Sequence, residues 1–328
     1  MAGTNAGDPR RAAAERPGTA TPPPAAAPKP LWRRSPVGLV GLGLIGGSLG
    51  LDLRALGADV RALVHRPVTA ARALERGLAG TVSTDPQVLA DCGLVVLALP
   101  LDRLLDPDPA LLAALPAGAV VTDVGSVKEP VLAAWAGRPG IRFVASHPMA
   151  GTAAAGVEAG EAGLFRGRPW VVTPDAATDP DALAQVAALA AAVGGRWTTC
   201  TAADHDRAVA LISHLPVLVG AALLATADRG GEGGLAGLVR VLASSGFADT
   251  TRVGGGNPDL GTLMARHNRE ALLAALELHR QEINVLETLV RRGDWSALQR
   301  ALERAHGLRP AFLAPPGDGP PERPALRS

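Results

Sequence analysis

Tyrosine is absent from this chain, lysine occurs only as Lys29 and Lys128, and aromatic residues make up 3% of the sequence. So few aromatic side chains, and no basic stripe at a net charge of +1, indicate no nucleic-acid partner. The two cysteines, Cys92 and Cys200, lack the spacing of metal ligands. We therefore expect them to be small core residues in a reducing cytoplasm, and we expect no metal site.

Proline is concentrated at the two ends. Residues 1–36 contain eight prolines and residues 307–328 contain six, out of 28 in the chain. This composition predicts disordered tails over 1–36 and 307–328. The first tail is rich in arginine and poor in acidic residues, which leaves an organelle transit peptide open as an alternative to a cytoplasmic location. It has no apolar stretch typical of a secretory signal.

Short apolar runs alternate with helical stretches through the first part of the chain. Continuous apolar strands separated by amphipathic helices indicate a parallel sheet covered on both faces. We therefore predict an α/β fold with a Rossmann-like, doubly wound dinucleotide-binding domain over 37–202. The expected strands are 37–41, 59–64, 93–99, 119–124, 141–145, 170–173 and 196–200.

Only helical periodicity follows, which predicts an all-α substrate and dimerisation domain over 203–306. Its expected helices are 204–228, 235–245, 259–292 and 294–305. The apolar segment 208–227 contains His214 and Pro216, which favours a buried helix over a membrane span. An apolar stripe predicts packing against a helix of a second subunit, hence a homodimer. The stripe comprises Leu272, Leu276, His279, Ile283, Leu286 and Val290.

A glycine-rich turn, Gly41-x-Gly43-x-x-Gly46, directly follows the first strand and begins a helix. The first glycine permits the tight turn, the second leaves room for a pyrophosphate, and the third lets helix and strand pack closely. The helix start at Leu44 and Ile45 supplies backbone N–H groups for the phosphates. The context predicts dinucleotide binding.

The end of the second strand discriminates between the two nicotinamide cofactors. An acidic residue there usually holds the ribose hydroxyls of NAD, but "LVHRP" at 63–67 contains none. Arg66, assisted by His65 or Arg61, could instead meet a 2′-phosphate, and the alternative is a solvated arginine. NADP is favoured over NAD.

Four further segments carry a family resemblance. They are "TDVGSVK" (122–128), "SHPMAGT" (146–152), "DHDRAVALISHLP" (204–216) and "SGFADTTRVGGGNP" (245–258). In this order they resemble the prephenate/arogenate dehydrogenase family, and the likeness runs from about Val37 to His306. The segments "SHLPVLVGAALL" and "ASSGFADTTRVGGGNPDLGTLMARHN" look most like the cyanobacterial branch, whose members favour arogenate and NADP.

The resemblance implies a reaction and roles for particular residues. Hydride leaves C4 of a cyclohexadienol for the nicotinamide while CO2 is lost and the ring becomes aromatic. The family's catalytic histidine falls on His147, which would accept the hydrogen bond of the C4 hydroxyl at a strand's carboxyl end. Ser126 would bind the same hydroxyl or the nicotinamide, and Arg252 would bind the ring carboxylate. Thr152 belongs to the same implied substrate site.

Two departures from the family pattern bear on the substrate. Many prephenate-using relatives carry a second histidine after "SHLP", where this chain has Val217. Some carry a glutamate after "HPMAGT", where this chain has Ala153. Both departures favour arogenate over prephenate. His214 has two alternative interpretations. It is either a structural histidine within an apolar helix or a residue that binds substrate.

Other functions remain open at this point. A β-hydroxyacid dehydrogenase would need a catalytic lysine in the helical domain, but no lysine follows Lys128. Lys128 itself is expected to shape its loop, to pair with Glu129 or to face solvent. An NADP-binding redox sensor would bind the cofactor without turnover, and a family member using prephenate with NAD is the third alternative. The remaining histidines are expected at the surface or at helix caps: His65, His205, His267 and His306.

Overall fold

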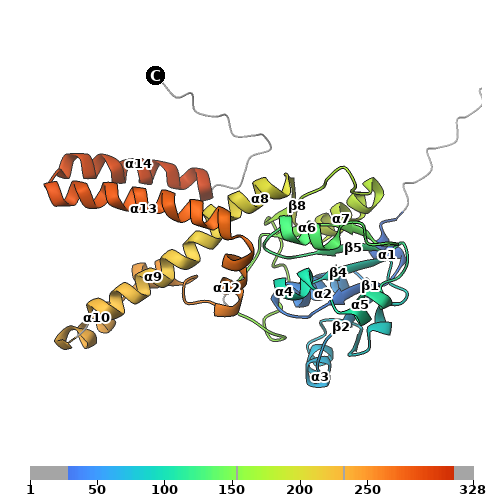
Figure 1. Ribbon diagram of the computed structural model, residues 1–328. Helices are drawn as coiled ribbons and strands as arrows, with labels where there is room; N and C mark the ends of the chain where they lie inside the picture. The colour runs from blue at the N-terminus through green and yellow to red at the C-terminus, as the bar shows by residue number, and fades with distance from the viewer. Residues whose placement is uncertain (1–28, 153, 232, 314–328) are drawn as a thin grey trace, which may run out of the picture.

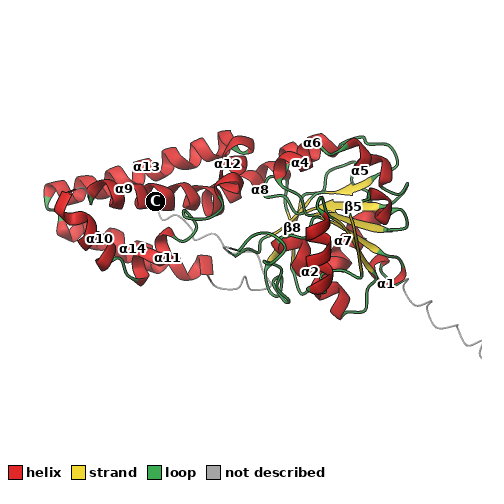
Figure 2. Ribbon diagram, turned by 90° about the horizontal axis from the view of Figure 1, so that it is seen from below, coloured by secondary structure: helices red, strands yellow, loops and turns green. Residues whose placement is uncertain are grey.

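The computed structural model describes residues 29–152, 154–231 and 233–313. Two parts are visible in Figure 1: a sheet domain with helices on both faces, and an elongated helical part that projects from one side of it. Figure 2 shows the same division from below, with the strands confined to one end of the molecule. The predicted combination of a Rossmann-like domain and an all-α domain is confirmed.

The main sheet contains six parallel strands in the order β3-β2-β1-β4-β5-β6. This is the strand order of dinucleotide-binding domains, in which the chain reverses its winding direction between β1 and β4. The apolar runs predict five of the strands but not β3, which is short, polar and at the sheet edge. The strands are β1 (Val37–Val40), β2 (Val60–Leu63), β3 (Thr81–Ser83), β4 (Leu94–Leu97), β5 (Val120–Asp123) and β6 (Arg142–Val144).

Alternate residues of the central strands face two separate cores, because successive side chains of a strand point to opposite faces. Leu39 and Val96 belong to one core, with α2 (Leu44–Ala55) and α7 (Pro180–Ala192) above it. Val40 and Val95 belong to the other. That second face is covered by η1 (Pro86–Leu89), α4 (Leu101–Leu105), α5 (Pro109–Ala114) and α6 (Glu129–Trp135).

A second, three-stranded sheet corrects the expected series. It consists of β7 (Ser146–Pro148), β8 (Pro169–Val172) and β9 (Arg196–Thr199), with β7 antiparallel to β8. The last two strands were expected in the main sheet, and β7 was not expected. Only Ala145 separates β6 from β7, so the chain leaves the main sheet at this point. His147 is therefore in a strand of its own, just beyond the carboxyl end of β6.

The helical part begins with three consecutive segments that form one long rod: α8 (Ala202–Val209), the π-helical turn η2 (Ala210–His214) and α9 (Leu215–Gly230). In Figure 1, α9 and the pair α13 and α14 extend away from the sheet domain. The remaining elements are η3 (Gly233–Leu235), α10 (Ala236–Leu242), α11 (Ser245–Thr251), α12 (Pro258–His267), α13 (Arg269–Arg292) and α14 (Trp295–Leu313).

Both predicted tails are too long where the structure describes them. Helix α14 continues to Leu313, past the expected end at 306 and through Pro310. At the other end, α1 (Leu31–Arg34) places Trp32 in the core at 5% exposure, and the Leu31 N–H donates to Gln185 Oε1 over 2.8 Å. One apolar side chain and one hydrogen bond therefore anchor a segment whose composition resembles a tail.

The short helix α3 (Pro67–Glu75) completes the sheet domain.

The long rod is less buried than expected. Residues Ala202–Gly230 form a helical stretch that is long and apolar enough to cross a membrane, and 22% of its most apolar window is buried. In α9, Gly220 is the buried residue. We expected this helix to be buried, but most of its apolar surface is exposed in the single chain. The neighbouring helices cover only part of it.

Candidate active site

The glycine-rich turn has the geometry that its sequence predicts. Gly41 has a φ of +92°, and a Cβ there would lie 2.4 Å from the carbonyl oxygen of Ala98. A Cβ on Gly46 would lie 2.0 Å from the Gly41 carbonyl oxygen. Around Gly43, by contrast, a Cβ would meet no described atom within 4 Å. The first and third glycines allow close backbone packing, and the second borders open space.

Helix α2 begins at this open space. Leu44 and Ile45 are its first residues, and no side chain within the described structure caps its N-terminus. The backbone N–H groups of the first turn are therefore free to bind phosphate oxygens. The carboxyl ends of β1 and β4 lie level here, since Val40 pairs with Leu97. A dinucleotide pyrophosphate fits this turn.

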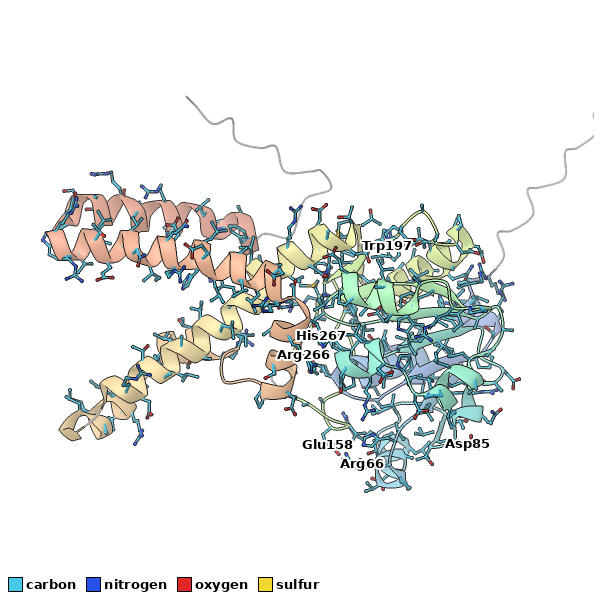
Figure 3. All side chains as sticks on the ribbon, viewed as in Figure 1. Arg66, Asp85, Glu158, Trp197, Arg266 and His267 are labelled. Atoms are coloured by element: carbon cyan, nitrogen blue, oxygen red, sulfur yellow. The ribbon has the colours of Figure 1, made fainter. Side chains whose placement is uncertain are left out.

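His65 and Arg66 follow the carboxyl end of β2, separated from it by the buried Val64. Both are exposed, and Arg66 occupies the residue before α3. Figure 3 shows Arg66 at the same end of the sheet domain as Glu158. Glu158 is bound by Arg72 through two hydrogen bonds of 2.6 and 3.1 Å. Arg72 thus neutralises the nearby carboxylate, while Arg66 forms no ion pair with any of the described residues.

His147 contacts a second histidine from the helical part. Its Nδ1 lies 2.9 Å from Nε2 of His205, and the two rings meet at 69° with centroids 5.2 Å apart. On the other side of the His205 ring, Nδ1 lies 2.7 Å from an oxygen of Asp206. His205 and Asp206 are each 2% exposed, whereas His147 is partly exposed. The expectation that His205 is a surface or capping residue is wrong.

Asp206 also joins the two parts of the molecule. One carboxylate oxygen accepts the backbone N–H of Lys128 over 2.7 Å, and the other accepts that of Glu129 over 2.9 Å. These N–H groups lie at the start of α6 in the sheet domain, while Asp206 belongs to α8. The carboxylate therefore holds the start of one domain's helix against the other domain.

Lys128 is completely buried, contrary to the expected pair with Glu129 or solvent. Its ammonium group forms an ion pair with Asp123 and donates to the Ser146 carbonyl oxygen over 2.7 Å. The other Asp123 oxygen accepts the Ser146 N–H over 3.0 Å. Burial lowers the pKa of Lys128, and the adjacent Asp123 carboxylate opposes this effect. This buried pair ties the end of β5 to the residue before His147.

The surroundings of His147 keep its ring neutral. Burial is the main reason that the pKa of His147 lies well below its usual value, and nearby positive charge on His205, Lys128 or His214 acts in the same direction. A neutral imidazole retains one ring nitrogen as an acceptor. His147 therefore has the protonation state that a general base requires at neutral pH.

His214 is held by a structural contact. It is 1% exposed in the π-helical turn, and its Nδ1 lies 3.1 Å from the amide nitrogen of Asn268. That amide also donates to the Asp206 carbonyl oxygen over 2.7 Å. Burial lowers the pKa of His214 to about 4, although Asp206 and the backbone of Ser126 partly oppose it. Ser126, between β5 and α6, thus lies beside His214 and near the His147 cluster.

The remaining expected substrate residues are less closely connected. Val217, partly buried on α9, faces α12, because a Cβ on Gly261 would lie 3.6 Å from its side chain. Arg252 follows α11 and Thr152 follows β7, and both are exposed. Within the described residues, neither of them is hydrogen-bonded to His147. Ala153 lies outside those residues.

Several residues of the cluster were not expected from the sequence: Asp123, Lys128, His205, Asp206 and Asn268. Two signals could have indicated some of them. The acidic and histidine residues of "DHDRA" stand in α8, directly before the long uncharged segment, and Lys128 is the one lysine between the predicted tails. Within the described residues, no group of three or more potential ligands is arranged for a metal ion.

The glycine turn and the sheet order are those of a dinucleotide-binding domain, and His147 lies just beyond the carboxyl end of β6. Two family models match the chain. The prephenate dehydrogenase nucleotide-binding domain matches residues 49–199, and the prephenate dehydrogenase dimerisation domain matches residues 201–304. The chain therefore belongs to the prephenate dehydrogenase family, and its cofactor is a pyridine nucleotide.

Individual relatives agree with this assignment. Cyclohexadienyl dehydrogenase of Zymomonas mobilis is 31% identical over 288 residues, which are 84% of this chain and 98% of that protein. The crystal structure of Synechocystis arogenate dehydrogenase is similar with a TM-score of 0.69 and 40% identity, covering 85% of this chain and 100% of that one. Prephenate dehydrogenase of Aquifex aeolicus, in complex with hydroxyphenyl propionate and NAD+, has a TM-score of 0.76 and 27% identity over 84% and 98% of the two chains.

Proposed function

We propose that this enzyme converts arogenate to tyrosine by oxidative decarboxylation with NADP as the hydride acceptor. The observation that carries the proposal is the placement of His147: a neutral ring, partly exposed, just beyond the carboxyl end of β6 and backed by buried groups. Ligands of doubly wound sheets bind beyond these strand ends. A histidine here can act on a hydroxyl next to a bound nicotinamide.

The chain's residues then have defined tasks. His147 takes the proton of the C4 hydroxyl, and Ser126 orients that hydroxyl from the loop before α6. Arg252 binds the ring carboxylate, and Thr152 contributes to the same site. When bound, the nicotinamide accepts the hydride from C4. Loss of CO2 leaves the bonding electrons in the ring, and His147 returns its proton to the phenolic oxygen.

Arogenate is favoured over prephenate by the residue on α9 that faces α12. Val217 offers an apolar side chain where many prephenate-using relatives have a histidine. An apolar group cannot donate a hydrogen bond to the side-chain carboxylate or keto oxygen of prephenate. The likeness to Synechocystis arogenate dehydrogenase supports this choice. The relatives described as prephenate dehydrogenases support the second candidate, prephenate with NAD or NADP.

NADP is favoured over NAD by the chemistry at the end of β2. His65 and Arg66 are exposed there, and no acidic residue stands in this turn to accept ribose hydroxyls. A guanidinium forms charge-assisted hydrogen bonds with a phosphate but gains little from a neutral hydroxyl. Arg66 would then hold the 2′-phosphate, while Gly41, Gly43 and Gly46 with the N–H groups of Leu44 and Ile45 hold the pyrophosphate.

We further propose that the enzyme is a cytoplasmic homodimer assembled through its C-terminal helices, without nucleic acid or membrane as a partner. The dimerisation-domain match supports the assembly. The apolar rod over Ala202–Gly230 and the stripe on α13 would then be covered by the second subunit.

A two-by-two assay tests the proposal: arogenate or prephenate as substrate, each with NADP or NAD. We expect the highest kcat/KM with arogenate and NADP. Arg66→Ala should lower kcat/KM for NADP by about 10- to 100-fold, because a charged hydrogen bond contributes about 1.5 to 3 kcal/mol, and should change that for NAD little. Preference for prephenate would select the second candidate, and cofactor binding without any turnover would select a redox sensor.

A further inference from the structure

His147 is backed by two buried residues of the helical part, His205 and Asp206. His205 Nε2 is 2.9 Å from His147 Nδ1, and His205 Nδ1 is 2.7 Å from the Asp206 carboxylate. Both residues are 2% exposed. We propose that His205 and Asp206 form a proton relay with His147, in which Asp206 fixes the ring protons of both histidines and His205 receives the second proton during turnover. This inference rests on the proposed reaction.

The carboxylate determines which ring nitrogens carry protons. An ionised carboxylate only accepts hydrogen bonds, so the His205 nitrogen beside Asp206 must be the donor. In a neutral His205 ring, the opposite nitrogen, Nε2, is then an acceptor. It accepts a hydrogen bond from Nδ1–H of His147. The remaining nitrogen of His147, Nε2, consequently has a free lone pair, which is what a base for the C4 hydroxyl requires.

The Asp206 carboxylate is itself well oriented for this task. It accepts the backbone N–H groups of Lys128 and Glu129 over 2.7 and 2.9 Å, and these bonds fix its orientation. Rotation of the side chain would break both bonds. The direction of the relay is therefore set by the backbone at the start of α6, not by the histidines.

The relay also explains how a proton can be held in a site that disfavours a charged His147. When Nε2 of His147 takes the hydroxyl proton, Nδ1–H can pass its own proton to Nε2 of His205. The positive charge then lies beside Asp206, in contact with an anion. As CO2 leaves and the phenolic oxygen gains charge, the two protons move back, so no net proton is released.

The groups around the relay act on it from several elements. Asp206 on α8 attracts a proton, whereas Lys128 at the start of α6 and His214 in the π-helical turn disfavour one on His147. Protonation of the free enzyme on His205 would turn His147 into its other tautomer, with a proton on Nε2. That tautomer cannot accept the hydroxyl proton. A proton held by the histidine pair before the substrate binds would therefore block the base.

The first experiment needs neither substrate nor cofactor. Nuclear magnetic resonance of the full-length protein labelled with ¹⁵N-histidine reports which ring nitrogen carries the proton. At pH 7.5 to 8 we expect the Nδ1–H form for both His147 and His205, in contrast to the Nε2–H form that neutral histidine prefers in water. Signals are assigned with His147→Gln and His205→Gln. An Nε2–H form of His147 in the unmodified enzyme would overturn the proposal.

The second experiment measures turnover of His205→Gln, whose amide can accept a hydrogen bond but cannot hold a proton. We expect kcat to fall by about 10- to 100-fold, within the range of general acid–base catalysis and its supporting groups, with KM changed less than about twofold. The acid limb of the pH profile should move, because the charge of His205 no longer acts on the pKa of His147. Undiminished kcat, or an unmoved acid limb, would overturn the relay.

His306→Gln is the matched control, because His306 is an exposed histidine on α14. It should leave both tautomers and kcat unchanged. Failure of the proposed function is distinguishable: an unmodified enzyme that turns over neither arogenate nor prephenate refutes the reaction, while the tautomer measurement still tests the hydrogen-bond chain.

Discussion

The sheet domain covers its own apolar side chains, whereas the helical part does not. Of the 22 large apolar side chains that are exposed among the described residues, four lie within residues 29–201 and 18 within residues 202–313. A folded domain gains most of its stability by removing apolar surface from water. One chain therefore contains a complete nucleotide domain, but the helical part needs a second surface to pack against.

The catalytic cluster is divided along the same line. His147 and Ser126 come from the sheet domain, and His205, Asp206 and His214 come from the helical part. The sheet domain thus contributes the proposed base, and the helical part contributes the groups that we propose orient it. Four changes test this comparison, from the largest expected effect to the smallest.

Removal of the base tests the contribution of the sheet domain. His147→Ala should lower kcat by about 10²- to 10⁴-fold, the range of general acid–base catalysis. The dissociation constant of NADP should stay within about twofold, because the glycine turn is untouched. Steady-state kinetics and a fluorescence titration of the cofactor measure the two quantities. Near-normal turnover would refute the role of His147.

A carboxylate on the exposed stripe tests the incompleteness of the helical part. Ile283 on α13 and Leu74 on α3 are both 48% exposed. An unpaired buried carboxylate costs several kcal/mol, so Ile283→Glu should weaken the dimer by about 100-fold or more. Leu74→Glu should leave it intact. Sedimentation velocity over a concentration series measures both, and equal behaviour of the two variants would contradict the comparison.

Arg252 tests whether the helical part also binds substrate. Arg252→Ala should raise the KM for arogenate by about 10- to 150-fold, which corresponds to a charged hydrogen bond of about 1.5 to 3 kcal/mol. The kcat should change less. Arg252 holds the ring carboxylate both in the bound substrate and during hydride transfer, before CO2 leaves, so the arginine stabilises the two states similarly. A variant in which only the KM for NADP rises would show that the role is misassigned.

His214 should make stability depend on pH. The pKa of His214 is about 4 in the folded protein, mainly because of burial, against about 6.5 in the unfolded chain. The unfolded state therefore binds the proton first, and the free energy of unfolding should fall as the pH drops from about 6.5 to 4. Urea denaturation at several pH values measures the slope, which His214→Gln should flatten. An unchanged slope would mean that other groups, such as His147, cause it.

Five strands of the main sheet and the glycine turn could be predicted because both depend on local signals. A continuous apolar run indicates a buried strand. Three glycines at fixed spacing after such a run are typical of the phosphate-binding turn of a dinucleotide-binding domain. Strand β3 lacked that signal, with Thr81 and Ser83 around one valine. The separation of β8 and β9 into a second sheet also had no local signal, since β7 is short and one residue separates it from β6.

The position of His147 at a strand end could be predicted, but the buried groups that contact it could not. His147 stands in a recognisable segment at a strand end. The contact between His205 and His147 spans 58 positions, and the one between Lys128 and Asp206 spans 78. Pairing at such separations is decided by how the two domains dock, which no periodicity records. The burial of Lys128 against Asp123 was also missed, because nothing local to their segment shows that Ser146 packs over the ammonium group.

The two backbone hydrogen bonds of Asp206 have a consequence for assembly of the active site during folding. The same carboxylate caps α6 of one domain and sets the ring orientation of a histidine in the other. A chain with both domains folded but undocked would still bind nucleotide, yet its base would point at random. Catalytic competence should therefore be the last property to be regained on refolding, later than cofactor binding and on the timescale of domain docking.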